Sequence, residues 1–149
     1  MKYVKVFHNP EAGEGAHSKD QLIEKIKAAG FDCSYSSTKK EIDEKRIPEK
    51  ADAIIIAGGD GTVRKLATYL IDRKILAKRF LVGLLPSGTA NNIARTLGIE
   101  GSVDEIIARW KDRNIKNFDI AKVDGIKKKK SIVGSNQEVW FVVFAWEYR

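Results

Sequence analysis

The stretch AIIIAGGDGT, residues Ala53–Thr62, determines the fold class that we expect for this chain. Its apolar half belongs to a predicted strand, Ala51–Ala57, and a continuous apolar run of this kind is typical of a strand buried on both faces of a parallel sheet. Gly58 and Gly59 end the strand, and a helix follows. The helix has apolar residues at positions i, i+3, i+4, i+7 and i+8, namely Val63, Leu66, Ala67, Leu70 and Ile71. A buried strand that leads through a glycine turn into an amphipathic helix predicts an α/β fold.

Strand and helix patterns alternate along the rest of the chain. Further strands are predicted at Lys2–His8, Asp32–Ser37 and Phe80–Leu85, the last of them also buried. Two helices begin with capping boxes, in which a serine is followed three residues later by Gln or Glu: Ser18 with Gln21, and Ser102 with Glu105. Gly30 ends the first of these helices, and shorter helices are predicted at Lys40–Arg46 and through Ile93–Leu97. We therefore expect a mainly parallel sheet flanked by helices.

The carboxyl-terminal part of the chain has a different pattern. Ile120–Val123 and Val139–Trp146 are predicted to form two strands joined by a lysine-rich turn that contains Lys127–Lys130. No residue of Val139–Trp146 is polar, so both faces of that strand need to be covered. Pairing or exchange of this strand between two copies would give a homodimer.

Length and charge restrict the class of partner. The chain has 149 residues, a net charge of +7 and one cysteine, Cys33, which suits one compact domain in a reducing, cytoplasmic environment. The positive charge favours an anionic partner such as a nucleotide or an acidic lipid surface. We expect no nucleic-acid partner, because no aromatic and basic residues are interleaved in a binding motif.

No signal region or apolar run of membrane-spanning length is seen, which predicts a cytoplasmic protein that is at most peripheral to the membrane.

Two glycine-containing loops follow predicted parallel strands, Gly58–Thr62 and Pro86–Thr89. In open α/β sheets this edge is where ligands bind, and glycines let backbone N–H groups approach phosphate oxygens. Each loop also leads into a helix N-terminus, which favours an anion. Asp60 is a carboxylate in this setting, so its predicted role is to hold Mg²⁺ or to accept a proton from an attacking hydroxyl. The alternative is that both loops are ordinary tight turns and that Asp60 is a helix N-cap.

Three segments together resemble the nucleotide motifs of the diacylglycerol kinase catalytic domain family, which includes bacterial lipid kinases and sphingosine kinases. They are Asn9–Gly13, Gly58–Thr62 and Pro86–Arg95, and Phe118–Val123 is similar to the strand that closes the family's amino-terminal domain. The resemblance implies a phosphofructokinase/NAD-kinase-like α/β domain that binds ATP and Mg²⁺ and serves γ-phosphoryl transfer to a lipid hydroxyl.

The resemblance also implies roles for particular residues. Catalytic roles fall on Asp60, Asn92 and Asp119, and Asp60 is the implied metal ligand. The implied nucleotide-binding residues are Asn9, Pro10, Gly13, Thr38, Gly58, Gly59, Asp60, Gly61, Thr62, Ser87, Gly88, Thr89 and Asn91.

Three departures from the family pattern limit these expectations. Asn92 stands where relatives often have Asp, and Arg64-Lys65 stand where an Asn-Glu pair is common. Family members also carry a second, β-rich domain that binds lipid. We therefore expect residues 1–125 to form the nucleotide-binding domain and residues 126–149 to begin the second domain, with little or no turnover by these residues alone. An NAD kinase and a non-catalytic nucleotide-binding or regulatory module remain the alternatives.

Overall fold

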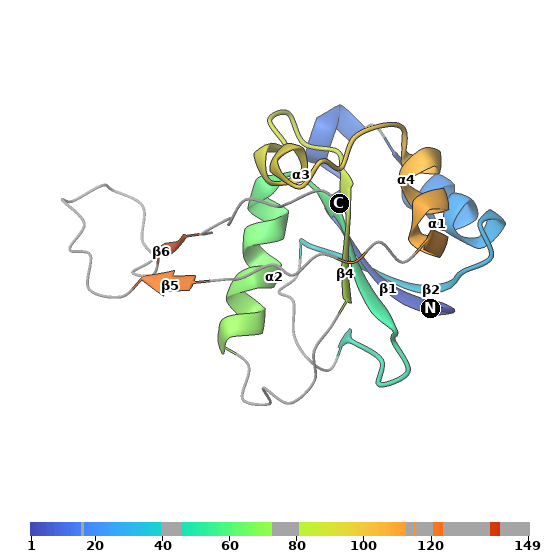
Figure 1. Ribbon diagram of the computed structural model, residues 1–149, viewed down its shortest axis with the longest axis horizontal. Helices are drawn as coiled ribbons and strands as arrows, with labels where there is room; N and C mark the ends of the chain where they lie inside the picture. The colour runs from blue at the N-terminus through green and yellow to red at the C-terminus, as the bar shows by residue number, and fades with distance from the viewer. Residues whose placement is uncertain are drawn as a thin grey trace.

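The computed structural model describes residues 1–15, 17–39, 46–72, 81–112, 115, 121–123 and 138–140. Its main sheet has four parallel strands in the order β2-β1-β3-β4 (Figure 1). Their bounds are Tyr3–His8 for β1, Asp32–Ser37 for β2, Ala53–Gly58 for β3 and Leu81–Pro86 for β4. The predicted α/β class with a parallel sheet is confirmed.

Helices cover both faces of this sheet. α1 (Lys19–Ala28) and α4 (Val103–Arg109) lie on one face, and α2 (Asp60–Asp72) lies on the other (Figure 1). α3 (Asn92–Thr96) follows β4, and the described residues also include the short 3-10 turns η1 (Ala12–Gly15) and η3 (Trp110–Asp112). Both predicted capping boxes are present, so local sequence starts α1 and α4 where it was expected to.

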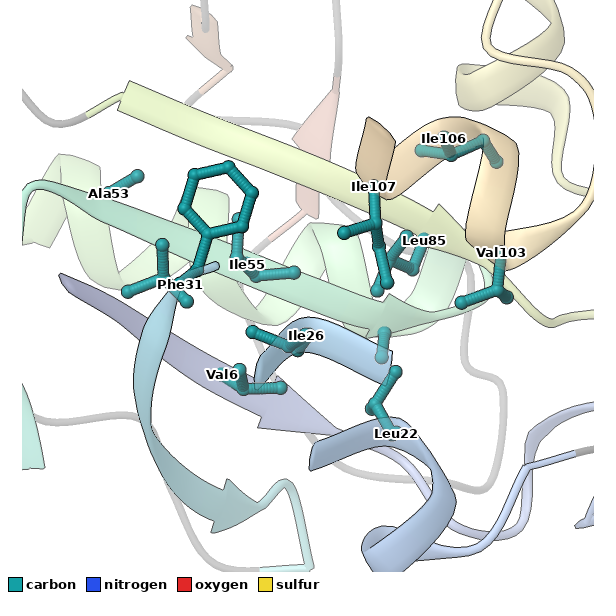
Figure 2. Packing of buried hydrophobic residues seen from close by; sticks show 12 residues of the cluster. Val6, Leu22, Ile26, Phe31, Ala53, Ile55, Leu85, Val103, Ile106 and Ile107 are labelled. Carbon is teal, nitrogen blue, oxygen red and sulfur yellow. The ribbon is translucent and has the colours of Figure 1, made fainter. Parts of the chain in front are cut away.

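The central strand β3 is buried on both faces. Ile55 packs in a core formed with α1 and α4, and Figure 2 shows it between Phe31, Ile26 and Ile107. Ile54 and Ile56 point to the opposite face and pack in a second core with Leu66 of α2. The unbroken apolar run therefore reflects two separate cores, one on each side of the strand.

β4 differs from the prediction. The sequence pattern predicted a strand buried along its whole length, but Leu81 is 39% exposed and Val82 is 43% exposed. Within the described sheet β4 is an end strand, and only its carboxyl half, Leu84 and Leu85, reaches the two cores. An apolar run identifies a strand, but it does not tell whether neighbouring elements cover all of it.

The structure describes three residues at each of the two predicted carboxyl-terminal strands and pairs them with each other. β5 (Ala121–Val123) is antiparallel to β6 (Glu138–Trp140), and this pair lies beside α2, on the side away from the main sheet (Figure 1). The remainder of the predicted strand Val139–Trp146, the lysine-rich turn and residues 40–45 of the predicted helix Lys40–Arg46 lie outside the described residues. Among the helices that the structure describes, none is long and apolar enough to cross a membrane.

The strand order contains a topological switch point. The chain moves from β1 to β2 on one side, through α1, and later from β3 to β4 on the other side, through α2. The connections leaving β1 and β3 therefore diverge to opposite faces of the sheet. In open α/β sheets ligands bind at the carboxyl ends of the strands where this divergence occurs.

His8, the last residue of β1, is a buried polar residue near this edge. It is 2% exposed, and its Nδ1 lies 3.1 Å from the hydroxyl oxygen of Tyr35. Burial, with a smaller contribution from the charge of His17, lowers the pKa of His8 below its usual value of 6.5. The unfolded chain therefore binds a proton at a pH where folded His8 is still neutral.

His8 is predicted to make the protein less stable in acid. The contribution of neutral His8 to the free energy of unfolding should be complete above pH 6.5. It should decline as the pH falls toward the lowered pKa of His8 in the folded state. Urea unfolding at several pH values should show that His8→Gln removes part of this slope, which for one proton cannot exceed about 1.4 kcal/mol per pH unit. His17→Gln should keep most of the slope, because burial is the larger cause of the shift. Identical slopes for the wild type and His8→Gln would contradict this account.

Candidate functional site

The parallel sheet brings nearly all of the predicted site residues to one edge. β1 leads into Asn9–Gly13, β2 into Thr38, β3 into Gly59–Thr62 and β4 into Ser87–Asn92. The predicted residues found there are Asn9, Pro10, Gly13, Thr38, Gly58, Gly59, Asp60, Gly61, Thr62, Ser87, Gly88, Thr89, Asn91 and Asn92. Asp119, the remaining predicted catalytic residue, lies outside the described residues.

The loop after β1 folds back on its own strand end. The backbone N–H of Asn9 donates to the carbonyl of Ala57 (2.9 Å), which ties the loop to β3. The side-chain oxygen of Asn9 accepts from the N–H of Glu11 (3.2 Å), and its carbonyl accepts from Ala12 (3.1 Å). Asn9 therefore shapes the turn as an Asx residue at the switch point between β1 and β3.

Two cations lie at the β2 side of the edge. Thr38 is buried; its N–H donates to the carbonyl of His8 (2.9 Å), and its carbonyl accepts from Nζ of Lys65 (3.2 Å). Lys39 forms an ion pair with Glu11 (2.8 Å) across the neighbouring loops. This pairing lowers the pKa of the Glu11 carboxyl and raises that of the Lys39 amine.

The contact of Lys65 with Thr38 is a feature that the sequence interpretation missed. Lys65 lies in the second turn of α2, and no local pattern marked it as a site residue. The partner itself depends on how α2 packs beside the end of β2, which no local pattern encodes.

The two glycine loops touch each other through their backbones. A Cβ atom built on Gly88 would lie 2.5 Å from Cα of Gly59, a distance that real Cβ atoms do not reach. The N–H of Ser87 also donates to the carbonyl of Gly58 (3.2 Å). Glycine at position 88 is thus required because backbone meets backbone there, and a Cβ on Gly59 would also be tightly placed, 3.0 Å from Cα of Gly88.

Asn91 closes the second loop. It has a left-handed backbone (φ 50°), its Oδ1 accepts from the N–H of Gly88 (2.9 Å), and its Nδ2 donates to the carbonyl of Gly88 (2.6 Å). Inside this region the Ser87 hydroxyl is buried and has no hydrogen-bond partner in the part of the chain that the structure describes. A buried hydroxyl without a partner is destabilising.

Asp60 connects the two loops. Its Oδ2 accepts from the backbone N–H of Asn92 (2.9 Å) and its Oδ1 from that of Ile93 (3.0 Å). The alternative interpretation made Asp60 an N-cap, and it does cap a helix, but the helix is α3 rather than its own helix α2. Its metal-binding and proton-accepting roles stay predictions. Among the described residues, no three His, Cys, Asp or Glu side chains are grouped so that they could hold a metal ion.

These features define an α/β domain with a glycine-lined edge at the switch point of a parallel sheet. A family model described as "Diacylglycerol kinase catalytic domain" matches residues 3–123. The chain belongs to the diacylglycerol kinase catalytic domain family, a family of lipid kinases.

Individual relatives agree with this assignment. The chain is 34% identical to "Diacylglycerol kinase" of Bacillus subtilis (strain 168) over 106 residues, which cover 66% of this chain and 34% of the relative. It is 31% identical to "Diacylglycerol kinase" of Staphylococcus haemolyticus (strain JCSC1435) over 135 residues, which cover 83% of this chain and 38% of the relative. A crystal structure of a candidate diacylglycerol kinase from Bacillus anthracis str. Sterne matches with a TM-score of 0.61 and 31% identity, covering 80% of this chain and 44% of that one. The matched part of the chain thus spans less than half the length of each of these relatives.

The contact between the glycine loops gives a steric prediction. Gly88→Ala should destabilise the protein by about 1–3 kcal/mol, because its Cβ would collide with the backbone of Gly59. Gly61→Ala is the matched control: a Cβ there meets nothing within 4 Å, so stability should be unchanged or rise by about 0.4–1 kcal/mol. Urea unfolding of both variants measures the difference. Equal stability of Gly88→Ala and the wild type would contradict the close approach of the two loops.

Proposed function

We propose that this chain binds the phosphates of ATP at the carboxyl edge of its sheet and serves a lipid kinase that transfers the γ-phosphoryl group of ATP to a lipid hydroxyl. The observation that carries the proposal is the convergence of the two glycine loops at this edge, where the backbones of Gly59 and Gly88 meet. Family membership and the names of the relatives support the lipid acceptor.

The residues at the edge fit a polyphosphate. Glycines leave backbone N–H groups accessible to phosphate oxygens, and α2 begins immediately after Gly59, so its positive helix end lies at the loop. Lys65 adds positive charge on the β2 side, whereas the charge of Lys39 there is paired with Glu11. Thr89 is exposed in the second loop and is available to donate its hydroxyl to a ligand. Thr62 is buried against Gly58, and its proposed contribution is through its N-terminal position in α2.

Phosphoryl transfer needs little covalent chemistry from the protein. Mg²⁺, when bound with ATP, would neutralise charge on the phosphates, and Asp60 is the carboxylate that we propose to assist it. The backbone of the two loops would hold the phosphates in one orientation, which supplies the positioning on which this reaction mainly depends.

We propose that residues outside those described bind the acceptor and supply the base that deprotonates it. The match spans 34–44% of the relatives' lengths, so groups elsewhere in such a protein can contribute both lipid binding and the base. We accordingly propose that these 149 residues bind ATP but transfer its phosphoryl group slowly or not at all.

Nucleotide binding can be tested with paired threonine variants. Isothermal titration with ATP and Mg²⁺ should show binding by the wild-type chain and about tenfold or greater weakening by Thr89→Ala, the loss of one hydrogen bond to a charged oxygen. Thr68→Ala is the control, because its hydroxyl donates to the carbonyl of Arg64 within α2 (3.0 Å), one helix turn earlier. Absence of binding by the wild-type chain would contradict the proposal and favour a regulatory module that does not bind nucleotide.

The acceptor is tested by offering alternatives. With labelled ATP and Mg²⁺, the isolated chain should transfer little or no label to diacylglycerol in vesicles, to a sphingoid base or to NAD. Rapid labelling of diacylglycerol would overturn the claim that other groups are needed. Labelling of NAD would assign the chain to the nucleotide kinases instead.

A further inference from the structure

The link between Asp60 and α3 joins segments that are far apart in the sequence. The carboxylate accepts from the first two backbone N–H groups of α3, which lie 32 and 33 residues further along the chain. These N–H groups have no partner within their own helix. A charged acceptor at this position is stronger than a neutral one, since both hydrogen bonds are charge-assisted.

The usual capping position of α3 does not perform this task. Asn91 is the N-cap residue of α3, but its left-handed backbone leaves it without a side-chain capping bond. Its side chain instead bonds the backbone of Gly88 twice, within its own loop. The cap of α3 is therefore supplied by the other phosphate loop, through Asp60.

The same two loops meet at two further points, the Gly59–Gly88 contact and the hydrogen bond from Ser87 to Gly58. These two contacts lie at the base of the second loop, and the Asp60 bonds lie at its far end. Together they fix both ends of Ser87–Asn91 relative to the first glycine loop. None of these contacts requires a cation.

We propose that Asp60 is a positioning residue that holds the Ser87–Asn91 loop against the glycine loop, independently of any metal ion, so that one phosphate chain can contact both loops. The statement about phosphate rests on the proposed function; the coupling of the loops does not. The role is additional to any contact that Asp60 makes with Mg²⁺.

The coupling is tested first in the protein without nucleotide or metal. By hydrogen exchange resolved to single amides, the N–H groups of Asn92 and Ile93 should be protected in the wild type. In Asp60→Asn, which offers one acceptor oxygen instead of two, they should exchange about tenfold faster or more, together with amides of the 87–91 loop.

Ser102→Ala is the matched control for this measurement. It removes the capping bond of α4, which starts on the other face of the sheet, so it should lower stability without changing exchange at Asn92 and Ile93. Unprotected amides at these two positions in the wild type, or equal exchange in Asp60→Asn, would overturn the proposal. Unprotected amides in the wild type would overturn the proposal even if Asp60→Asn does not fold.

The second test separates positioning from metal binding. ADP affinity is measured in EDTA and again with Mg²⁺ for the wild type, Asp60→Asn and Ser102→Ala. The proposal expects Asp60→Asn to weaken ADP binding at least about fivefold in EDTA, while Ser102→Ala binds like the wild type. A loss that occurs only with Mg²⁺ would overturn it. If the wild-type chain does not bind ADP, the proposed function fails, and the coupling of the loops is still decided by hydrogen exchange.

Discussion

The central strand β3 is buried on both faces, and this burial determines where the helices and the candidate site lie. Ile55 needs a core on one side of the sheet, and Ile54 and Ile56 need another on the opposite side. α1 and α4 supply the first core and α2 supplies the second, so the chain has to change sides between β1 and β3. The loops then diverge at the carboxyl ends of these strands, which is where ligands bind in open α/β sheets. The hydrophobic pattern that builds the two cores thus also locates the site.

Much of the fold follows from local sequence. The capping boxes of Ser18 and Ser102 place the starts of α1 and α4, because a serine side chain and the residue three positions later satisfy the same helix end. The strands Asp32–Ser37 and Ala53–Gly58 were predicted within two residues at each end. The parallel arrangement then brings the motifs Asn9–Gly13, Gly58–Thr62 and Ser87–Asn92 together, as their order along the chain indicated.

Features that depend on tertiary packing could not be predicted in this way. The exposure of Leu81 and Val82 follows from the position of β4 at the end of the sheet, which their apolar side chains do not reveal. The hydrogen bonds of Asp60 could not be predicted either. The sequence suggested Mg²⁺, a proton or its own helix as the partner of Asp60, whereas in the structure its carboxylate bonds to α3, the helix that follows the next strand. The residues whose roles came from family resemblance are at the expected edge, whereas Asp119 lies outside the described part.

The meeting of Gly59 with Gly88 has a consequence for how such a protein can change over time. In most packed contacts a larger residue on one side is accommodated when its neighbour becomes smaller. Here both neighbours already have the smallest side chain that an amino acid can have, and the opposing atoms belong to the backbone. No second substitution at the partner glycine can relieve a first one. A substitution at one of these two positions therefore cannot be compensated by a substitution at the other. Sequence variation at this edge is expected at the residues around them.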